Sequence, residues 1–353
     1  MEITDHIALE EIESLRAHVR EADEFISRYV DLESPDTFRF ESRNPSSLDF
    51  VQSERVEAIV NYNRINDFRF INKFFEAISK RLDIGGLYIG CVETKTSRKK
   101  RVLAKMPSPV NYAWYAVDFT YKRVVPKLPV LKKAYFSITQ GNNRVLTMSE
   151  TTGRLVSCGY RLVDVCEIGY LTWFVARKVS EPVYDMNPTY GAIVGLNRIG
   201  YQGKMIKVYK LRTMHPYSEY IQDFMYRNNA LKAGGKIDED VRITNWGKLI
   251  RKLWIDEIPM LYNWLRGDVK LVGVRPLSRH YFDLYPEELQ QLRIRFKPGL
   301  IPPFYRDLPK TLDEIAESER QYLLSYEKKP IRTDIRYFFS SMYNIIIKRA
   351  RSA

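Results

Sequence analysis

Two adjacent carboxylates, Asp256 and Glu257, directly precede Ile258-Pro259 in the C-terminal half of the chain. Lysines and arginines bracket this acidic pair on both sides, and the candidates for contact with phosphate groups are Lys210, Arg212, Arg251 and Arg275. Cations grouped around an acidic pair suit chemistry on an anionic, phosphorylated substrate. Reading of duplex nucleic acid would instead call for a recognition helix or stacked motifs, so no nucleic-acid partner is expected.

The acidic pair lies within a segment, Asn245 to Gly267, whose pattern predicts an amphipathic helix. Apolar residues at helical spacing form the stripe that we expect to be buried: Ile250, Trp254, Ile258, Leu261 and Leu265. Asn245 can cap the start of this helix and Gly267 can close its end. At about 100° per residue, Asp256 falls almost opposite the stripe and Glu257 falls at its edge.

Pro259 conflicts with a straight helix here, because it cannot donate a hydrogen bond to the carbonyl of Ile255 and its ring clashes there, at a cost of roughly 3 kcal/mol. A kink at this proline would loosen the turn that carries the two acids. A solvated ion pair between Lys252 and Asp256, one helical turn apart, accounts for the same residues equally well. The helix alone leaves both interpretations open.

Two strands are predicted before the acidic segment, from Tyr190 to Leu196 and from Met205 to Arg212. The turn between them begins at Arg198-Ile199-Gly200 and could form a hairpin. Because side chains alternate along a strand, Lys210 and Arg212 share one face, where they could grip a diphosphate. The alternative is that both cations are solvent-exposed at the end of the strand and bind no ligand.

Further charged motifs flank the acidic segment. The stretch from Asp238 to Thr244 leads into it, the stretch from Leu271 to Pro276 predicts a short strand, and a basic turn runs from Arg293 to Gly299. The additional motif residues in these stretches and in the hairpin turn are Arg198, Asp240, Arg242 and Lys297.

A length of 353 residues suggests roughly two domains. The formal charge of +13 and pI near 9.4 imply an anionic partner, which could be a nucleic acid, a lipid surface or a phosphorylated substrate. Three scattered cysteines and four histidines form neither a disulfide framework nor a zinc pattern, which favours a reducing, cytoplasmic compartment. No signal peptide and no run of about 18 apolar residues is evident, so we expect no transmembrane protein, although the chain could lie on a membrane.

The N-terminal half begins with a predicted amphipathic helix from Asp5 to Leu32, within a first segment of residues 1–35. A polar loop is expected from Glu33 to Glu54. An α/β layer with parallel pairing follows, because strand and helix patterns alternate around Gly85-Gly86. The predicted strands are residues 56–61, 87–92, 161–168 and 171–177, the last two forming a hairpin, and the predicted helices are residues 66–80 and 149–157.

Within this second segment, residues 36–181, the stretch from Val56 to Val179 resembles the C-terminal half of a class I methyltransferase. In that Rossmann-like fold a Gly-Gly turn precedes a strand and an antiparallel pair closes the sheet. The glycine-rich first turn that would hold S-adenosylmethionine has no counterpart in this sequence. The resemblance therefore implies a partial Rossmann-like scaffold that does not transfer methyl groups.

An insertion from residue 95 to residue 148 interrupts this scaffold. It contains a basic run from Lys95 to Arg101 and an aromatic stretch that includes Tyr112, Trp114, Tyr115, Phe119 and Tyr121. Aromatic residues flanked by cations are typical of a helix that lies on an anionic lipid surface. Aromatic residues at helical spacing also commonly pack into a protein's own core, so both interpretations stay open.

From Tyr190 to Tyr305 the sequence resembles the catalytic domain of the bacterial sugar transferases known as monotopic phosphoglycosyl transferases. The motifs that carry this resemblance, in order, are Arg198-Ile199-Gly200, Lys210-Leu211-Arg212-Thr213-Met214, Asp240-Val241-Arg242-Ile243-Thr244, Gly247, Arg251, Asp256-Glu257-Ile258-Pro259, Asn263, Gly267-Asp268, Val272-Gly273-Val274-Arg275-Pro276 and Lys297-Pro298-Gly299. The resemblance implies an α+β catalytic domain over residues 182–353.

It also implies a reaction: transfer of a sugar 1-phosphate from a UDP-sugar to polyprenyl (undecaprenyl) phosphate, with release of UMP, in the first membrane step of polysaccharide biosynthesis. In the family the aspartate of the acidic pair, here Asp256, attacks the phosphorus nearest the sugar and carries a covalent phosphosugar. Glu257 would bind Mg²⁺ together with Asp256 or orient the nucleophile, and the four cations named first would contact the phosphates. The implied location is the cytoplasmic face of the bacterial inner membrane, in a peripheral or monotopic mode.

The sequence departs from the family pattern before the Arg198 motif, where members usually carry a hydrophobic re-entrant helix and this chain has the methyltransferase-like region instead. The aromatic insertion could serve as a substitute anchor, and Tyr343 to Arg351 is a second candidate for surface contact. Because this helix is lost, a non-catalytic, membrane-peripheral assembly partner of glycan-synthesis enzymes is the alternative to an active enzyme. The sequence does not indicate the sugar or the oligomeric state.

Overall fold

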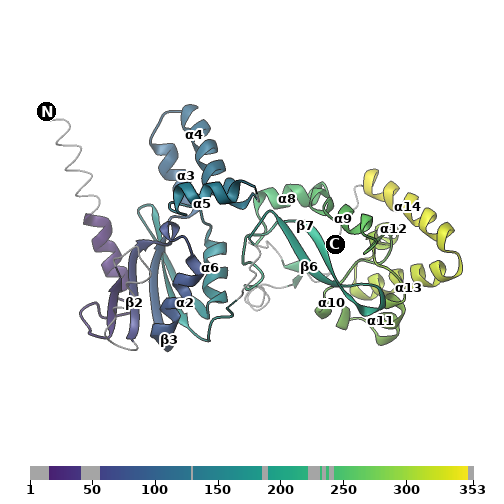
Figure 1. The fold of residues 1–353 in the computed structure, drawn as a ribbon, viewed down its shortest axis with the longest axis horizontal. Helices are drawn as coiled ribbons and strands as arrows, with labels where there is room; N and C mark the ends of the chain where they lie inside the picture. Colours follow the sequence, from purple (N-terminus) through teal and green to yellow (C-terminus); the bar gives the residue numbers. More distant parts are fainter. Residues whose placement is uncertain are drawn as a thin grey trace. The chain divides into compact units, whose positions relative to one another are not determined.

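The computed structural model describes residues 16–40, 56–128, 130–184, 190–221, 231–232, 236–237 and 242–348, which form two compact units (Figure 1). Unit 1 comprises the chain up to Tyr190 together with His215–Ile221, and unit 2 comprises Gly191–Met214 together with the described residues that follow Ile221. The division falls close to the boundary suggested by the sequence at residues 181 and 182. The first ten or so residues of the predicted N-terminal helix, as well as Asp240 and the last basic residues, lie outside the described residues.

Unit 1 is built on a five-stranded sheet in the order β1-β2-β3-β5-β4. Its strands are β1 (Thr37–Phe40), β2 (Val56–Arg64), β3 (Leu82–Val92), β4 (Tyr160–Ile168) and β5 (Leu171–Lys178). Strands β1, β2 and β3 are parallel, β5 runs antiparallel to β3, and β4 pairs with β5 as a hairpin. The predicted parallel layer closed by an antiparallel pair is confirmed.

The helices of unit 1 lie around this sheet (Figure 1). They are α2 (Ile71–Arg81), α3 (Lys95–Ala104), α4 (Val110–Phe119), α5 (Leu131–Thr139) and α6 (Met148–Ser157), with the short turns η2 (Ile65–Asp67), η3 (Thr120–Val124) and η4 (Val125–Lys127). Helix α6 confirms the prediction for residues 149–157. Helix α2 starts later than the predicted residue 66, because the buried side chain of Asn66 donates to the carbonyls of Glu93 and Arg144 and holds the chain in a turn.

Two hydrophobic clusters cover the two faces of the sheet, since alternate residues of each strand point to opposite sides. On one face, Phe74 and Phe75 of α2 pack against Tyr88 of β3. On the other face, Phe25 and Ile26 belong to a cluster with alternate residues of β2, β3 and β5. The first predicted helix, which is helical over the described residues 16–26, is therefore part of the core of unit 1.

Two predictions for the N-terminal region are wrong. Strand β1 lies inside the stretch from Glu33 to Glu54 that was expected to be loop. Its last residue, Phe40, is buried against Phe68 and Phe74, and this tertiary contact overrides the polar composition around it. The N-terminal helix also ends at residue 26, before the predicted Leu32.

The described residues of unit 2 contain three strand pairs. They are the antiparallel pair β6 (Ile193–Ile199) and β7 (Met205–Leu211), joined through η5 (Tyr201–Gly203), the antiparallel pair β8 (Leu231–Lys232) and β9 (Lys236–Ile237), and the parallel pair β10 (Lys270–Val272) and β11 (Gly299–Ile301). The predicted hairpin and the predicted short strand before Arg275 are both confirmed. Gly273 and Gly299 pack backbone to backbone, so that a Cβ on Gly299 would lie 2.1 Å from the backbone nitrogen of Gly273.

Helices make up most of the rest of unit 2. They are α8 (Asn245–Lys252), α9 (Met260–Leu265), α10 (Arg279–Asp283), α11 (Glu287–Ile294), α12 (Phe304–Asp307), α13 (Leu312–Lys328) and α14 (Pro330–Ile346), with the short turn η6 (Ile255–Glu257) between α8 and α9. Val272 of β10 packs in a core with Leu289 of α11, Tyr322 of α13 and Tyr337 of α14. This core supports the β10–β11 pair and the loop that carries Arg275.

Candidate active site

The two acids lie on the short 3-10 turn η6, between two separate helices. Helix α8 ends at Lys252, and the chain then breaks at Trp254, whose φ of 57° is left-handed. Pro259 stands at the start of α9, where its missing N–H is not needed. The prediction of one helix kinked at Pro259 is therefore wrong, because the break precedes the acids.

The predicted buried stripe is also wrong. Ile258, Leu261 and Leu265 are 55%, 46% and 77% exposed, whereas Asp256 is only 9% exposed and Asn263 is fully buried. After the break at Trp254, Asn263 and Met260 of α9 face the protein, whereas the apolar residues of the predicted stripe face outward. Asp256 is thus not on a solvated face, which was one of the two interpretations that the helix pattern left open.

Asn263 attaches α9 to strand β7. Its Oδ1 accepts from the backbone N–H of Tyr209 at 2.9 Å, and its Nδ2 donates to the carbonyl of Lys207 at 2.8 Å and to Asp268 at 3.0 Å. These bonds replace the strand pairing that the outer edge of β7 lacks at this point. They fix the turn η6, directly before α9, beside the strand that carries Lys210.

Helix α8 is held at its start by Thr244 and not by Asn245, the predicted cap. The hydroxyl of Thr244 accepts from the N–H of Gly247 at 2.8 Å and donates to the carbonyl of Thr213 at 3.1 Å. A Cβ at Gly247 would lie 2.0 Å from that same carbonyl oxygen, so only glycine fits here. The chain just after β7 and the start of α8 therefore meet without space for a larger residue.

The strained residue Trp254 is stabilised by Tyr305. Its indole N–H donates to the Tyr305 hydroxyl at 3.0 Å, and the two rings meet edge to face with their centroids 5.5 Å apart. Tyr305 is in turn held by Asn344 of α14, whose side chain donates to the Tyr305 carbonyl at 3.0 Å. The left-handed turn before the acids thus has its own support from the C-terminal helices.

Lys210 and Glu257 form an ion pair, with Nζ 2.6 Å from Oε1 and both side chains largely shielded from solvent. Burial lowers the pKa of Lys210, and the neighbouring charge of Arg275 lowers it further, while Glu257 opposes this shift. The pair places a cation of β7 against the turn that carries the candidate nucleophile.

Asp256 is buried beside this pair. Burial raises the pKa of its carboxyl above the usual value, and the charge of Glu257 raises it further. The charges of Lys210 and Arg251 lower it. A poorly solvated carboxylate with cations beside it is suited to act as a nucleophile.

Of the four predicted phosphate contacts, Lys210, Arg251 and Arg275 are near enough to the acids or to each other for their charges to act on the pKa values described above. The Nε of Arg251 donates to the Thr213 hydroxyl at 2.8 Å. This bond connects Arg251 of α8 to the chain just after β7. Arg212 is directed elsewhere, since its Nε donates to the carbonyl of Gly191 at 2.8 Å.

The additional motif residues are more dispersed. Burial lowers the pKa of Arg198, and the positive charge of Arg275, which lies near it, lowers this pKa further. Arg242 is buried and Lys297 is exposed, with its ammonium beside the backbone of Gly267. Asp240 lies outside the described residues.

Three residues that support the site were not assigned a role from the sequence: Thr213, Thr244 and Asn263. All three lie in the motifs by which the sequence was recognised. The side chains of Thr244 and Asn263 bond to backbone on another element, and the hydroxyl of Thr213 accepts from the side chain of Arg251. A polar residue in the middle of an otherwise apolar helical stretch, as Asn263 is, was the one available signal. Its bonding partners in β7 could not be known before the strand and the helix were placed together.

An apolar surface surrounds the acids. The exposed large apolar residues of α8, η6 and α9 are Trp246, Leu249, Leu253, Ile255, Ile258, Leu261, Tyr262, Trp264 and Leu265. Exposed apolar groups this dense, within two short helices, are unusual on a protein that meets only water. Lys248, Lys252 and Arg266 lie among them and are also exposed.

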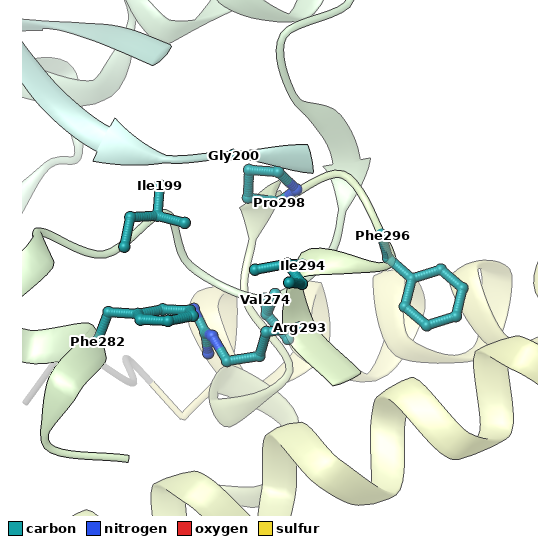
Figure 2. A pocket seen from close by; sticks show the side chains of 8 residues that line it. All are labelled: Ile199, Gly200, Val274, Phe282, Arg293, Ile294, Phe296 and Pro298. Carbon is teal, nitrogen blue, oxygen red and sulfur yellow. The ribbon is translucent and has the colours of Figure 1, made fainter. Parts of the chain in front are cut away.

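A small pocket of unit 2 lies elsewhere, beside the turn that follows β6 (Figure 2). It is lined by Ile199, Gly200, Val274, Phe282, Arg293, Ile294, Phe296 and Pro298. The pocket is mainly apolar and contains neither of the two acids, so it is not the candidate active site. In the part of the chain that the structure describes, no three acidic, histidine or cysteine side chains cluster as a metal site, and no helix is long and apolar enough to cross a membrane.

Residues 181–348 match the family described as Bacterial sugar transferase. Similar proteins include the galactosyl transferase CpsE of Streptococcus agalactiae serotype III (strain NEM316), 38% identical over 136 residues, which cover 37% of this chain and 30% of that protein. The uncharacterized sugar transferase EpsL of Bacillus subtilis (strain 168) is 42% identical over 126 residues, covering 36% of this chain and 52% of that one. The undecaprenyl-phosphate galactose phosphotransferase of Salmonella typhimurium (strain LT2) is 34% identical over 114 residues, covering 31% and 24%.

This chain therefore spans about half or less of the length of these relatives. Among solved structures, part of the chain is similar to an O-methyltransferase family 2 protein from Planctomyces limnophilus, with 17% identity, a TM-score of 0.22, and coverage of 35% of this chain and 31% of that one. Similarity at this level does not establish a shared activity. The match of residues 181–348 to this family agrees with the motif order on which the sequence resemblance rested.

Proposed function

We propose that this chain acts as a bacterial sugar transferase: it moves a sugar 1-phosphate from a UDP-sugar to polyprenyl phosphate, releases UMP, and so starts the assembly of a polysaccharide on a lipid carrier. The observation that carries the proposal is the buried carboxylate of Asp256 beside the Lys210–Glu257 ion pair, within a segment that matches the family. Relatives whose names specify undecaprenyl-phosphate sugar phosphotransferases support the same type of transfer.

In the proposed first step, a carboxylate oxygen of Asp256 attacks the phosphorus nearest the sugar. A new bond forms between this oxygen and phosphorus, the bond between phosphorus and the bridging oxygen breaks, and UMP leaves with the electron pair. In the second step a phosphate oxygen of the polyprenyl phosphate attacks the same phosphorus. The aspartyl bond then breaks and the carboxylate of Asp256 is regenerated.

The neighbouring residues have distinct tasks in this scheme. Lys210 holds Glu257 in place, and Arg251 and Arg275 supply positive charge for the diphosphate. Mg²⁺ fits the donor set, since it often uses one or two carboxylates together with substrate phosphate oxygens. Asp256 and Glu257 would hold it, and it would supply further neutralisation of phosphate charge.

The lipid acceptor suits the surface around the acids. Ile258 follows the acidic pair directly and is exposed, as are Leu261 and Leu265 on the next helix. Apolar side chains exposed around a buried nucleophile suit an acceptor whose phosphate lies at the surface of a lipid layer. We accordingly infer a peripheral or monotopic position on the cytoplasmic face of the inner membrane, where UDP-sugars are available.

The test is a product assay across a panel of radiolabelled UDP-sugars, with undecaprenyl phosphate, Mg²⁺ and the purified full chain. The proposal expects labelled lipid and UMP in equal amounts from the wild type with at least one sugar, and neither product from Asp256→Asn. Trapping the label on the protein in the absence of lipid would identify the covalent intermediate. A folded wild type that is inactive with every common UDP-sugar, or a fully active Asp256→Asn protein, would overturn it.

A further inference from the structure

An apolar stripe on unit 1 faces outward along α4 and η3. Its members are spaced alternately by four and three residues, and they are Val110, Trp114, Val117, Tyr121 and Val124. Each of these side chains is between 37% and 59% exposed. Helical spacing of this kind places all five on one side of the helix, over a length of about 20 Å at 1.5 Å per residue.

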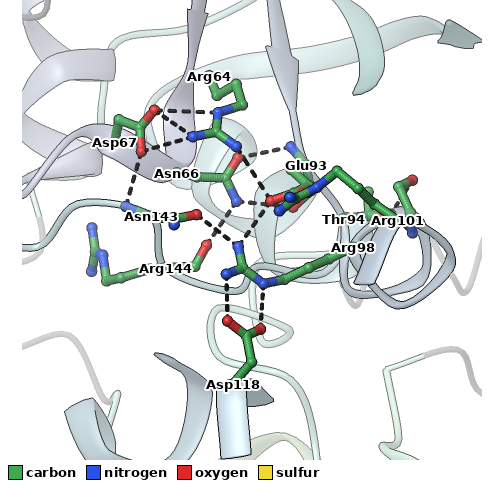
Figure 3. Close-up of polar contacts among 11 residues, drawn as sticks. Arg64, Asn66, Asp67, Glu93, Thr94, Arg98, Arg101, Asp118, Asn143 and Arg144 are labelled. Atoms are coloured by element: carbon green, nitrogen blue, oxygen red, sulfur yellow. Dashed lines mark hydrogen bonds and ion pairs between the residues drawn. The ribbon is translucent and has the colours of Figure 1, made fainter. Parts of the chain in front are cut away.

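Opposite the stripe lie Tyr115 and Phe119, with the ammonium groups of Lys99 and Lys95 over their rings. Between the stripe and these rings, Asp118 is held inward by a buried ion pair (Figure 3). Asp118 accepts two hydrogen bonds from Arg98, at 2.6 and 2.8 Å, and Arg98 also donates to Glu93 at 2.9 Å. Arg98 and Glu93 are almost completely buried. Further along, the buried Arg123 pairs with Glu150 and donates to the carbonyl of Val145 at 2.8 Å.

These contacts fix which side of α4 faces outward. Turning the apolar stripe inward would bury it only by breaking the pairs of Asp118 and Arg123, which would leave buried charges without partners. The orientation is therefore a stable property of unit 1 and not a loosely packed arrangement. A helix fixed with this apolar stripe outward offers the stripe to an apolar surface.

Charge indicates what kind of surface this is. Residues 95–139 contain eleven lysines and arginines and a single acidic residue, Asp118, so this segment supplies ten of the thirteen net positive charges of the chain. Asp118 is already paired with Arg98. Exposed lysines lie on α3 and α5, at positions that include Lys99, Lys100 and Lys132.

We propose that α4 and η3 dock unit 1 onto an anionic lipid surface, with the apolar stripe inserted among the lipids and the surrounding lysines against the headgroups. A second copy of this chain fits the stripe poorly, because it would bring the same excess of positive charge. A nucleic acid would engage the cations but would leave the aliphatic valines uncovered. Such docking is independent of the phosphoryl transfer proposed for unit 2.

The experiment measures binding of the full chain to vesicles by flotation. Vesicles of phosphatidylcholine mixed with phosphatidylglycerol should bind the wild type at least tenfold more tightly than vesicles of phosphatidylcholine alone. The variant Trp114→Ser/Val117→Ser/Tyr121→Ser should bind the mixed vesicles at least tenfold more weakly. Val163→Ser/Val165→Ser is the matched control, since it removes two exposed apolar residues of β4 in the same unit, and it should bind like the wild type.

Unit 2 also exposes apolar groups, so a second measurement localises the contact. In a Cys166→Ser background, where Cys91 and Cys158 are buried, a fluorophore at Val117→Cys should be quenched by nitroxide lipids, and one at Val163→Cys should not. Equal quenching at both positions, or flotation of the triple variant at wild-type strength, would overturn the proposal. So would a dimer in sedimentation that the triple variant abolishes while its lipid binding stays unchanged.

Discussion

Lys210 of strand β7 and Glu257 of turn η6 form an ion pair 2.6 Å long that joins the strand to the turn carrying Asp256. The two residues are far apart in the sequence. Asn263 of α9, the helix that follows the turn, is attached to the same strand through bonds from its side chain to the backbone of β7. The nucleophile proposed here is therefore positioned by its neighbours on β7 and α9 rather than by the helix pattern around it.

The first prediction concerns this ion pair. Lys210→Met and Glu257→Gln should each lower the free energy of unfolding, and a double-mutant cycle should give a coupling of about 1 kcal/mol, between the values for exposed and buried pairs. Urea unfolding of the four proteins measures it. Strictly additive effects would mean that the pair contributes no coupling. The variant Arg320→Gln is a control, because its ion pair with Glu317 lies exposed on α13.

The second prediction is that Asp256→Asn abolishes transfer and also stabilises the protein. Burial raises the pKa of the Asp256 carboxyl in the folded state, so the folded state binds the proton more tightly than the unfolded state does. At pH 7 the ionised carboxylate therefore costs stability, and this cost appears as the pH rises through the folded pKa. The neutral amide avoids it.

Thermal unfolding should accordingly show a higher Tm for Asp256→Asn than for the wild type at pH 7, and a smaller difference near pH 4. The loss of transfer should be at least about a thousandfold, as for removal of other covalent nucleophiles. Asp313→Asn, on the exposed first turn of α13, is the control and should change neither quantity. A lower Tm for Asp256→Asn would contradict the role of burial.

The third prediction concerns Asn263. Asn263→Ala should cost about 2–4 kcal/mol, because it leaves the part-buried N–H of Tyr209 and carbonyl of Lys207 without their partner. It should also lower the rate of transfer, since η6 loses its attachment to β7. The control Asn245→Ala changes an exposed residue at the start of α8, and its effect should stay below about 0.5 kcal/mol. Chemical unfolding of both variants measures the two losses of stability.

The sequence predicted the α/β layer of unit 1 and the β6–β7 hairpin because both depend on local periodicity and turn residues. The hairpin of β4 and β5 was found within a few residues of its limits. The strand expected to begin at Leu87, after Gly85-Gly86, is present, but β3 begins at Leu82 and contains both glycines. Strand β1 was missed because Phe40 belongs to the core only through contacts with residues far along the chain. Its local composition gave no sign of this.

The acidic segment was misread for a physical reason. The periodic pattern of Ile258, Leu261 and Leu265 is real, but periodicity cannot tell which side of a helix meets the protein and which side meets another apolar phase. The left-handed conformation of Trp254 could not be predicted either. It is stabilised by the contact with Tyr305, a residue distant in the sequence. The charged candidates themselves were recognised because their motif order could be compared with a known family.

The last prediction concerns the pH dependence of unit 1. His215 lies beside Thr147, with its Nδ1 3.2 Å from the hydroxyl that caps helix α6. Burial lowers the pKa of His215 to about 4, and the charge of Arg123 contributes to the shift. The unfolded chain takes up the proton near pH 6.5, so between these values the unfolded state binds more protons and stability falls as the pH is lowered.

Between pH 7 and pH 5, the free energy of unfolding should fall by about 2 kcal/mol more in the wild type than in His215→Gln. Urea unfolding of both proteins at the two pH values measures this difference. The variant should lose less stability than the wild type over that interval, even if it is the weaker protein at pH 7. His280→Gln should keep the wild-type pH dependence, because that residue lies exposed in unit 2. An imidazole signal of His215 that titrates near pH 6.5 in the folded protein would contradict the prediction, since a group that is equally basic in both states cannot link protonation to unfolding.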